Sequence, residues 1–266
     1  KKKTLKIDNK NMTLNTVAPY RLVKTMRAGI LVLGALLSKY KIAKVSLPGG
    51  CAIGSRPVDL HLFALKKLGA KIKIKSGYIY ASAKNGLKGS NIKFPKISVG
   101  ATENAIIAAV QAKGKTTLYN CATEPEIKDL ILFLKKMGCN ISINQRKITI
   151  EGVINTKNVD HEVMFDRIEA GTYLVAAALT EGNLRIRGID PKIIKTEINI
   201  LKKTGAKILQ KKDEIIIQGI KKIKNINIKT SPYPGFPTDL QAQMMVLLCK
   251  ANKKSFIKED IFENRF

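Results

Sequence analysis

A glycine-rich stretch, residues 48–61, carries the side chains best suited to chemistry. Three glycines surround Cys51 and give the stretch the backbone freedom of a loop. Pro57 and Asp59 favour the first turn of a helix, so a helix is predicted to follow the loop. A partly exposed thiol beside Arg56 and a helix N-terminus is favoured as the thiolate, which predicts a reactive Cys51.

Asp239 is a second candidate, because a positioned carboxylate can act as a general base. It follows a Pro-Thr pair just before an apolar stretch, where a carboxylate is also an ordinary helix N-terminal residue, and the spacing alone leaves both roles open. Arg56 is informative because only eight of the 48 basic residues are arginine. The planar guanidinium grips phosphate or carboxylate. His61 falls within a predicted helix and is interpreted as structural.

Four apolar helices are predicted to begin in short polar patches. Helix N-termini favour anions, and equivalent helix starts in a pseudo-symmetric fold can converge on one place. We therefore expect an anionic ligand where these helix starts meet. The four patches are residues 25–27, 98–102, 166–167 and 237–239.

A repeat organises the elements that carry these residues. Its glycines are Gly69, Gly138 and Gly205, at steps of 69 (138 − 69) and 67 (205 − 138), each following a Leu-Lys-Lys helix end. Such a glycine suits the left-handed position after a helix, and an alternating apolar pattern then predicts a β-hairpin. The hairpins are expected at residues 71–83, 140–151 and 207–218.

Between the hairpins a second, Ala-rich helix recurs, predicted over residues 102–113 and 168–181. Each unit therefore reads strand, helix, strand, helix and two hairpin strands, with the Ala-rich helix buried and the Lys-edged helix half exposed. Units of this size favour two pseudo-symmetric α/β domains with a cleft between them. We expect a catalytic-loop domain over residues 1–163 and the first part of a second domain over residues 164–266.

The net charge of +28 would suit a polyanion, but the lysines are scattered and no Arg/aromatic run resembles a nucleic-acid motif. We therefore expect neither nucleic acid nor membrane as a partner. The four cysteines include no C-x-x-C pair and no neighbouring histidine at ligand spacing, so no zinc site is predicted. Free thiols and the lack of a long apolar run fit the cytoplasm.

Seven ordered motifs of the chain resemble those of the enolpyruvyl transferases. The family's phosphoenolpyruvate-binding Lys-Asn segment at the start and Arg-bearing segment at the end have no counterpart in these 266 residues, so the chain is expected to be part of a longer enzyme. The motifs lie at residues 25–28, 48–61, 96–102, 124–127, 166–172, 236–243 and 262–265.

The resemblance implies two domains of repeated βαβαββ units, each an inside-out α/β barrel. It implies transfer of enolpyruvate from phosphoenolpyruvate to the 3-hydroxyl of UDP-N-acetylglucosamine, which releases phosphate and opens peptidoglycan synthesis. In the family, Cys51 would protonate the methylene carbon of the donor, Arg56 would hold the donor, and Asp239 would deprotonate the sugar hydroxyl. No metal or organic cofactor is implied, and a monomer is expected.

The resemblance also assigns binding positions. Those implied for UDP-N-acetylglucosamine are Arg27, Arg56, Pro57, Val58, Asp59, Leu60, Lys96, Ile97, Ser98, Val99, Asp239 and Ile261. Glu124, Asp166, Glu263 and Arg265 would line or brace the cleft, and structural ion pairing is an equal alternative for these four.

Two rival functions remain open at this point. A shikimate-pathway enolpyruvyl transferase shares the fold and the donor, but the Gly-Gly-Cys loop argues against it. A basic nucleic-acid-binding protein on similar repeats would bind any nucleic acid with a steep salt dependence.

Overall fold

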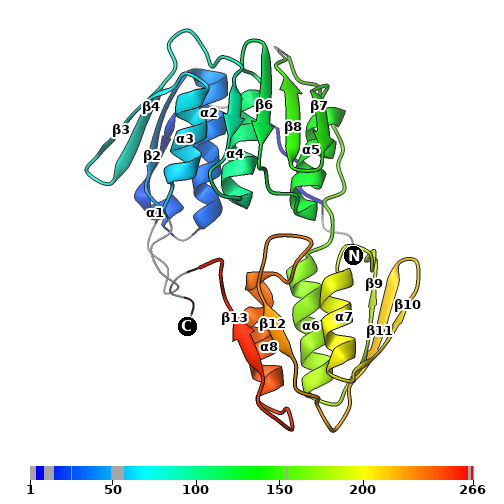
Figure 1. Ribbon diagram of the computed structural model, residues 1–266. Coiled ribbons are helices and arrows are strands. Elements are labelled where there is room, and N and C mark those ends of the chain that lie inside the picture. Colours follow the sequence, from blue (N-terminus) through cyan, green and yellow to red (C-terminus); the bar gives the residue numbers. More distant parts are fainter. Residues whose placement is uncertain are drawn as a thin grey trace.

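Two groups of helices and sheets form two lobes, joined by an extended segment (Figure 1). The structure is a computed structural model, and it describes residues 4–8, 15–24, 26–48, 57–153, 155–262 and 265. Each lobe has its own hydrophobic core. The first core runs from Val23 to Ile150 and the second from Ala170 to Leu248. The predicted division after residue 163 falls between them and stays a prediction.

The first unit of the first lobe forms a four-stranded sheet in the order β1-β2-β4-β3. β1 and β2 are parallel and the other pairs are antiparallel, because helices cross from β1 to β2 whereas β3 and β4 form a hairpin. The elements are β1 (Val17–Ala18), α1 (Tyr20–Val23), η1 (Arg27–Leu31), α2 (Val32–Tyr40), β2 (Ile42–Ser46), α3 (Asp59–Lys67), β3 (Lys71–Lys75) and β4 (Tyr78–Ser82).

The second unit repeats this arrangement in a sheet of order β5-β6-β8-β7, again with one parallel and two antiparallel pairs. The predicted βαβαββ order is thus confirmed. Its elements are β5 (Asn91–Lys93), α4 (Val99–Ala109), β6 (Lys115–Tyr119), α5 (Pro125–Lys136), β7 (Asn140–Asn144) and β8 (Lys147–Glu151).

The second lobe contains two partial units. The third unit forms a sheet of order β10-β11-β9, and the fourth forms the parallel pair β12-β13. The elements are α6 (Arg167–Leu179), β9 (Asn183–Arg187), α7 (Lys195–Lys203), β10 (Lys207–Gln210), β11 (Glu214–Gln218), β12 (Asn227–Lys229), η2 (Thr238–Leu240), α8 (Gln241–Leu248) and β13 (Phe256–Lys258).

The third unit differs from the predicted pattern, because residues 155–166 form no strand before α6. These residues lie instead along the first lobe. The Lys157 amide donates to the Met137 carbonyl at 2.9 Å, and His161 Nε2 lies 3.1 Å from Asp129 Oδ1 on α5. Contacts with α5 therefore take the place of pairing with β9.

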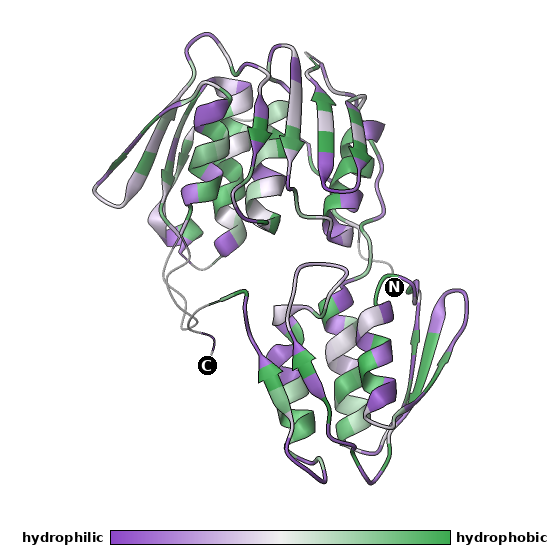
Figure 2. Cartoon of the chain, in the orientation of Figure 1, coloured by the Kyte–Doolittle hydropathy of each residue, from purple (hydrophilic) through white to green (hydrophobic). Residues whose placement is uncertain are grey.

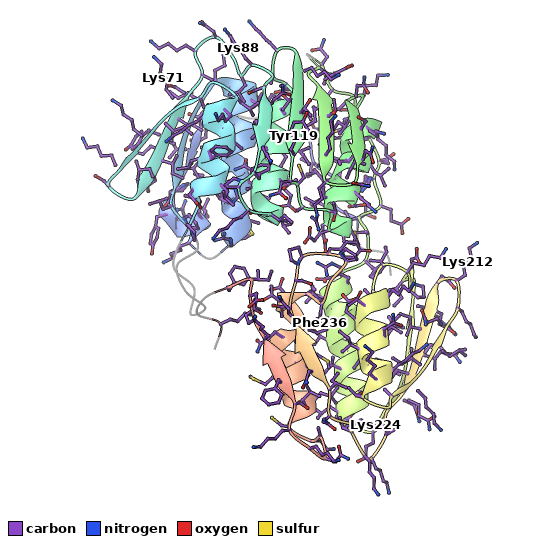
Figure 3. The ribbon with its side chains drawn as sticks, viewed as in Figure 1. Lys71, Lys88, Tyr119, Lys212, Lys224 and Phe236 are labelled. Carbon is purple, nitrogen blue, oxygen red and sulfur yellow. The ribbon has the colours of Figure 1, made fainter. Side chains whose placement is uncertain are left out.

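The Ala-rich helices lie in the interior and the sheets lie outside them, as an inside-out barrel requires (Figure 1). Seven of the eleven residues of α4 are buried, whereas α5 buries one stripe and exposes its Lys135 and Lys136 edge. Strands alternate between apolar and polar residues (Figure 2). Lysines such as Lys71, Lys88 and Lys212 project from the outer edges (Figure 3).

The helix bounds differ by a few residues from those predicted. α4 begins at Val99 rather than Thr102, because the Ser98 side chain accepts a hydrogen bond from the Ala101 amide at 3.3 Å and caps the helix. The three repeat glycines have φ values of 94°, 98° and 105°, which confirms the left-handed position after each helix. Among the described residues, no helix is long and apolar enough to cross a bilayer.

Candidate functional site

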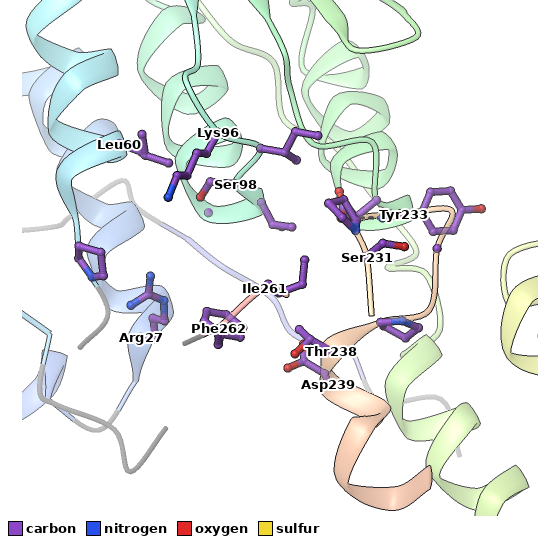
Figure 4. Close-up of a pocket in the computed structure, with 18 of the residues that line it drawn as sticks. Arg27, Leu60, Lys96, Ser98, Ser231, Tyr233, Thr238, Asp239, Ile261 and Phe262 are labelled. Carbon is purple, nitrogen blue, oxygen red and sulfur yellow. Dashed lines mark hydrogen bonds between the residues drawn. The ribbon is translucent and has the colours of Figure 1, made fainter. Parts of the chain in front are cut away.

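A cleft of about 630 Å³ lies between the lobes and is lined by both. Figure 4 shows Lys96 and Ser98 on one side, Thr238 and Asp239 on the opposite side, and Ile261 and Phe262 between them. Eleven of the predicted positions line this cleft, and they come from segments more than 200 residues apart. These are Arg27, Pro57, Asp59, Leu60, Lys96, Ile97, Ser98, Val99, Glu124, Asp239 and Ile261.

The first-lobe wall presents the N-terminus of α4 to the cleft. Ser98 and Gly100 both line it, and the exposed Lys96 precedes them. Gly100 lies against the ring of His61, where a Cβ would come within 3.1 Å of Cε1. Amide groups at a helix start, together with an ammonium group, can bind phosphate or carboxylate.

His61 stands behind this wall and is 2% exposed. Its Nδ1 lies 3.1 Å from Asn104 Nδ2, and Asn104 Oδ1 accepts the Gly34 amide at 2.9 Å. The amide group therefore donates to Nδ1, which places the proton of a neutral ring on Nε2. Burial, and secondarily the charge of Arg27, lowers the pKa of His61 to about 4. The structural interpretation of His61 agrees with this geometry.

The second-lobe wall centres on Asp239 in η2. Arg265 Nη1 and Nη2 both lie 3.2 Å from Asp239 Oδ1, and Nη1 also donates to Thr238 Oγ1 at 2.9 Å. Thr238 Oγ1 in turn donates to Glu259 Oε2 at 2.7 Å. The guanidinium holds one carboxylate oxygen, and the side chain of Asp239 is still 60% exposed at the cleft. A base that must reach substrate requires such access.

Buried polar contacts beside the cleft join the two lobes. Arg167, at the start of α6, is 7% exposed and its Nε donates to Glu126 Oε1 on α5 at 2.8 Å. Glu124 is also buried, and its Oε1 accepts the Tyr233 amide at 3.2 Å. Burial raises the pKa of the adjacent Glu103, and the carboxylates of Glu126 and Glu124 raise it further.

Several predicted residues are placed elsewhere. Val58 is 8% exposed in the first core and does not line the cleft. Asp166 does not line it either; its Oδ1 accepts the amides of Ile168 and Glu169 at 2.8 and 3.0 Å and caps α6. Cys51, Arg56 and Glu263 lie outside the described residues.

The whole chain, residues 1–266, matches the EPSP synthase (3-phosphoshikimate 1-carboxyvinyltransferase) family. The chain belongs to the EPSP synthase family. Its fold agrees: an enolpyruvyl transferase, NikO, from Streptomyces tendae superposes with a TM-score of 0.79 at 21% identity, over 95% of this chain and 60% of that one.

Two relatives are much closer in sequence than that solved structure. The UDP-N-acetylglucosamine 1-carboxyvinyltransferase of Pelagibacter ubique (strain HTCC1062) is 74% identical over 266 residues, which are 100% of this chain and 64% of that protein. The protein of the same name from Endomicrobium trichonymphae is 53% identical over 251 residues, 94% of this chain and 60% of its own length. The chain thus spans less than two thirds of either relative.

The loop of residues 231–235 lines the cleft through Ser231, Pro232, Tyr233 and Gly235, and the sequence did not predict this. Arg167 also lines the cleft, as expected of the helix start at residues 166–167, although no separate binding role was predicted for it. The loop carries no local sequence signal, because its position at the cleft depends on contact with the first lobe. Among the described residues, no group of three or more His, Cys, Asp or Glu could hold a metal ion.

Proposed function

We propose that the chain is the larger part of an enzyme that transfers enolpyruvate from phosphoenolpyruvate to the 3-hydroxyl of UDP-N-acetylglucosamine and releases phosphate. The observation that carries this proposal is the cleft, in which an α4 helix start with Lys96 faces an accessible carboxylate, Asp239. The names of the two relatives at 74% and 53% identity support the choice of nucleotide sugar.

The two walls of the cleft would have different roles, one in binding and the other in proton transfer. The α4 amides, Ser98 and Lys96 would bind the diphosphate of the sugar nucleotide, because positive charge and aligned N–H groups meet there. The remaining walls of the nucleotide-sugar site would be formed by Arg27, Pro57, Asp59, Leu60, Ile97, Val99 and Ile261. The exposed Asp239 would take the proton of the attacking hydroxyl, so that the oxygen can add to the donor.

Cys51 and Arg56 would complete the reaction from the glycine-rich loop. Cys51 would deliver a proton to the methylene carbon of phosphoenolpyruvate, and Arg56 would hold its anionic groups as charge redistributes. Loss of a proton from the resulting adduct and departure of phosphate would then give the enolpyruvyl product. A cytoplasmic location, a monomeric state, and the absence of nucleic acid and membrane from the reaction are part of the same proposal.

The test is a choice of acceptors, made with a version extended at both ends to the length of the relatives. Phosphate release from phosphoenolpyruvate is expected with UDP-N-acetylglucosamine and not with shikimate 3-phosphate. Release only with shikimate 3-phosphate would assign the chain to the other branch of the family.

A further inference from the structure

The two lobes meet at the peptide group of Tyr233. This residue lies in the 231–236 loop, between β12 and η2 of the second lobe, yet both polar groups of its backbone bind first-lobe side chains. Its amide donates to Glu124 Oε1 at 3.2 Å. Its carbonyl accepts Arg146 Nη2 at 2.9 Å and Thr123 Oγ1 at 3.3 Å. The first lobe therefore binds both polar groups of the Tyr233 backbone.

The next carbonyl along the chain is bound by the other lobe. Pro234 O accepts Thr196 Oγ1 from the α7 side at 2.6 Å. Two consecutive carbonyls of the loop are thus hydrogen-bonded to different lobes. These bonds restrict movement of the loop relative to both lobes. Hydrogen bonds within the loop, from Gly235 N to Pro232 O at 2.9 Å and from Ser231 N to Phe236 O at 3.0 Å, keep it compact.

Arg146 is the positively charged residue in this contact between the lobes. It stands in the turn between β7 and β8, and its Nη1 donates to the Cys121 carbonyl at 2.9 Å while Nη2 reaches Tyr233. The Cys121 amide returns a hydrogen bond to the Arg146 carbonyl at 3.0 Å, which fixes the base of the side chain. A planar fork can serve two carbonyls at once, whereas the ammonium of lysine is a point charge on a flexible stem.

The loop leads directly into the second-lobe wall of the cleft. Phe236 is 3% exposed in the second core, and Thr238 and Asp239 follow it in η2. A shift of the Tyr233 peptide would therefore be passed along a short, well-packed segment to the Asp239 carboxylate. The opposite wall, with Lys96 and Ser98, belongs to the same lobe as Arg146.

We infer that Arg146 is a positioning residue, which ties the 231–236 loop to the first lobe and so sets the place of Asp239 relative to the α4 helix start. Arg146 does not line the cleft. The tie itself is independent of the reaction, while its catalytic consequence rests on the proposed function.

The test of the tie uses the 266-residue chain and amide hydrogen exchange. Arg146→Ala is expected to speed exchange of the hydrogen-bonded amides of Ser231, Tyr233 and Gly235 by about tenfold, which corresponds to the loss of one charge-assisted hydrogen bond, with no change in β9 and β11. Arg146→Lys should loosen the same amides, since the fork is lost. Lys147→Ala is the matched control, because it removes a neighbouring exposed charge from the same hairpin and should leave the loop protected. Unchanged loop exchange in both Arg146 variants would overturn the inference.

The catalytic consequence is measured on the version extended to the length of the relatives. Arg146→Lys is the main variant, and it also replaces the alanine variant if that one does not fold. It should lower kcat by about 10- to 100-fold with little change in KM for UDP-N-acetylglucosamine. The reason is that a small displacement of Asp239 disturbs the geometry of proton transfer. Unchanged kcat beside a loosened loop would remove the positioning role. An inactive parent enzyme would refute the proposed function and leave the exchange result to decide the tie.

Discussion

Asp239 is the general base of the proposed reaction, and its substitution tests that role. In the version of full family length, Asp239→Asn is expected to lower kcat by roughly two to four orders of magnitude, because the amide keeps the shape but cannot take a proton. The affinity for the nucleotide sugar should change little. Initial rates of phosphate release give kcat, and equilibrium titration gives the affinity.

Arg265 provides the control for that experiment, since it binds Asp239 Oδ1 and Thr238 without being the base. A positioning role for Arg265 predicts a smaller loss for Arg265→Lys than for Asp239→Asn. Near-normal turnover of Asp239→Asn would reduce Asp239 to a carboxylate at a helix start.

His61 makes the stability of the chain depend on pH. In the unfolded chain, the histidine takes up a proton as the pH falls below 6.5. In the folded chain, burial lowers its pKa to about 4, so it takes up the proton only near that pH. Protons therefore favour the unfolded state between these values, and the free energy of unfolding should fall by about 3 kcal/mol through this group as the pH drops from 6.5 to 4.

Urea unfolding at a series of pH values measures that slope. His61→Gln, whose side-chain oxygen can still accept from Asn104, should remove this share of the slope. Above pH 7.5, where the histidine is neutral in both states, any difference between the two proteins should be independent of pH. An equal slope below pH 6.5 in both would contradict a neutral buried His61.

At the scale of elements, Gly69 and Gly138 end the Lys-edged helices α3 and α5 in the same way. After α5, the Cys139 amide bonds the Leu134 carbonyl at 3.0 Å and the Gly138 amide bonds the Lys135 carbonyl at 2.9 Å. The same pair of bonds recurs after α3, from Ala70 to Leu65 and from Gly69 to Lys66. This closure requires a left-handed residue, which glycine adopts without a steric penalty.

Gly138→Ala should therefore lower the free energy of unfolding by about 1 to 2 kcal/mol through backbone strain alone, since a Cβ there meets nothing within 4 Å. Gly138→Asn should lose less, because asparagine tolerates the left-handed region. Chemical denaturation compares the two, with Lys135→Ala on the exposed side of α5 as the control. Equal losses of unfolding free energy for alanine and asparagine would show that the left-handed φ of Gly138 is not the cause of the destabilisation.

At the scale of the molecule, the 266 residues alone should bind UDP-N-acetylglucosamine weakly and show no transferase activity. The described cleft has most of the proposed nucleotide-sugar positions, yet the chain covers only 64% of its relative from Pelagibacter ubique. Enolpyruvyl transfer has to exclude water from its intermediate, which requires two complete lobes closing on both substrates. Phosphate release by the chain and by the extended version is the comparison, and similar rates would contradict this expectation.

The sequence alone determined the repeated units. The hairpins at residues 140–151 and 207–218 and the left-handed glycines follow from patterns within a few neighbours, because side-chain alternation and φ preference are local properties. The polar helix starts were equally visible, and all four contribute lining residues to one cleft, through Arg27, Ser98, Arg167 and Asp239. Motif resemblance added roles for Cys51 and Arg56, which lie outside the described residues.

Only the tertiary structure decided how the lobes meet. Nothing near Asp166 in the sequence distinguishes a cleft residue from a cap, and the structure makes it a cap because its side chain turns back to its own helix amides. Arg146 and Tyr233 stand 87 residues apart, and neither has a local pattern that predicts their contact. Such a pairing depends on which two loops the chain topology brings together. The acceptor is a backbone carbonyl, which every residue carries, so no residue type in the sequence indicates it.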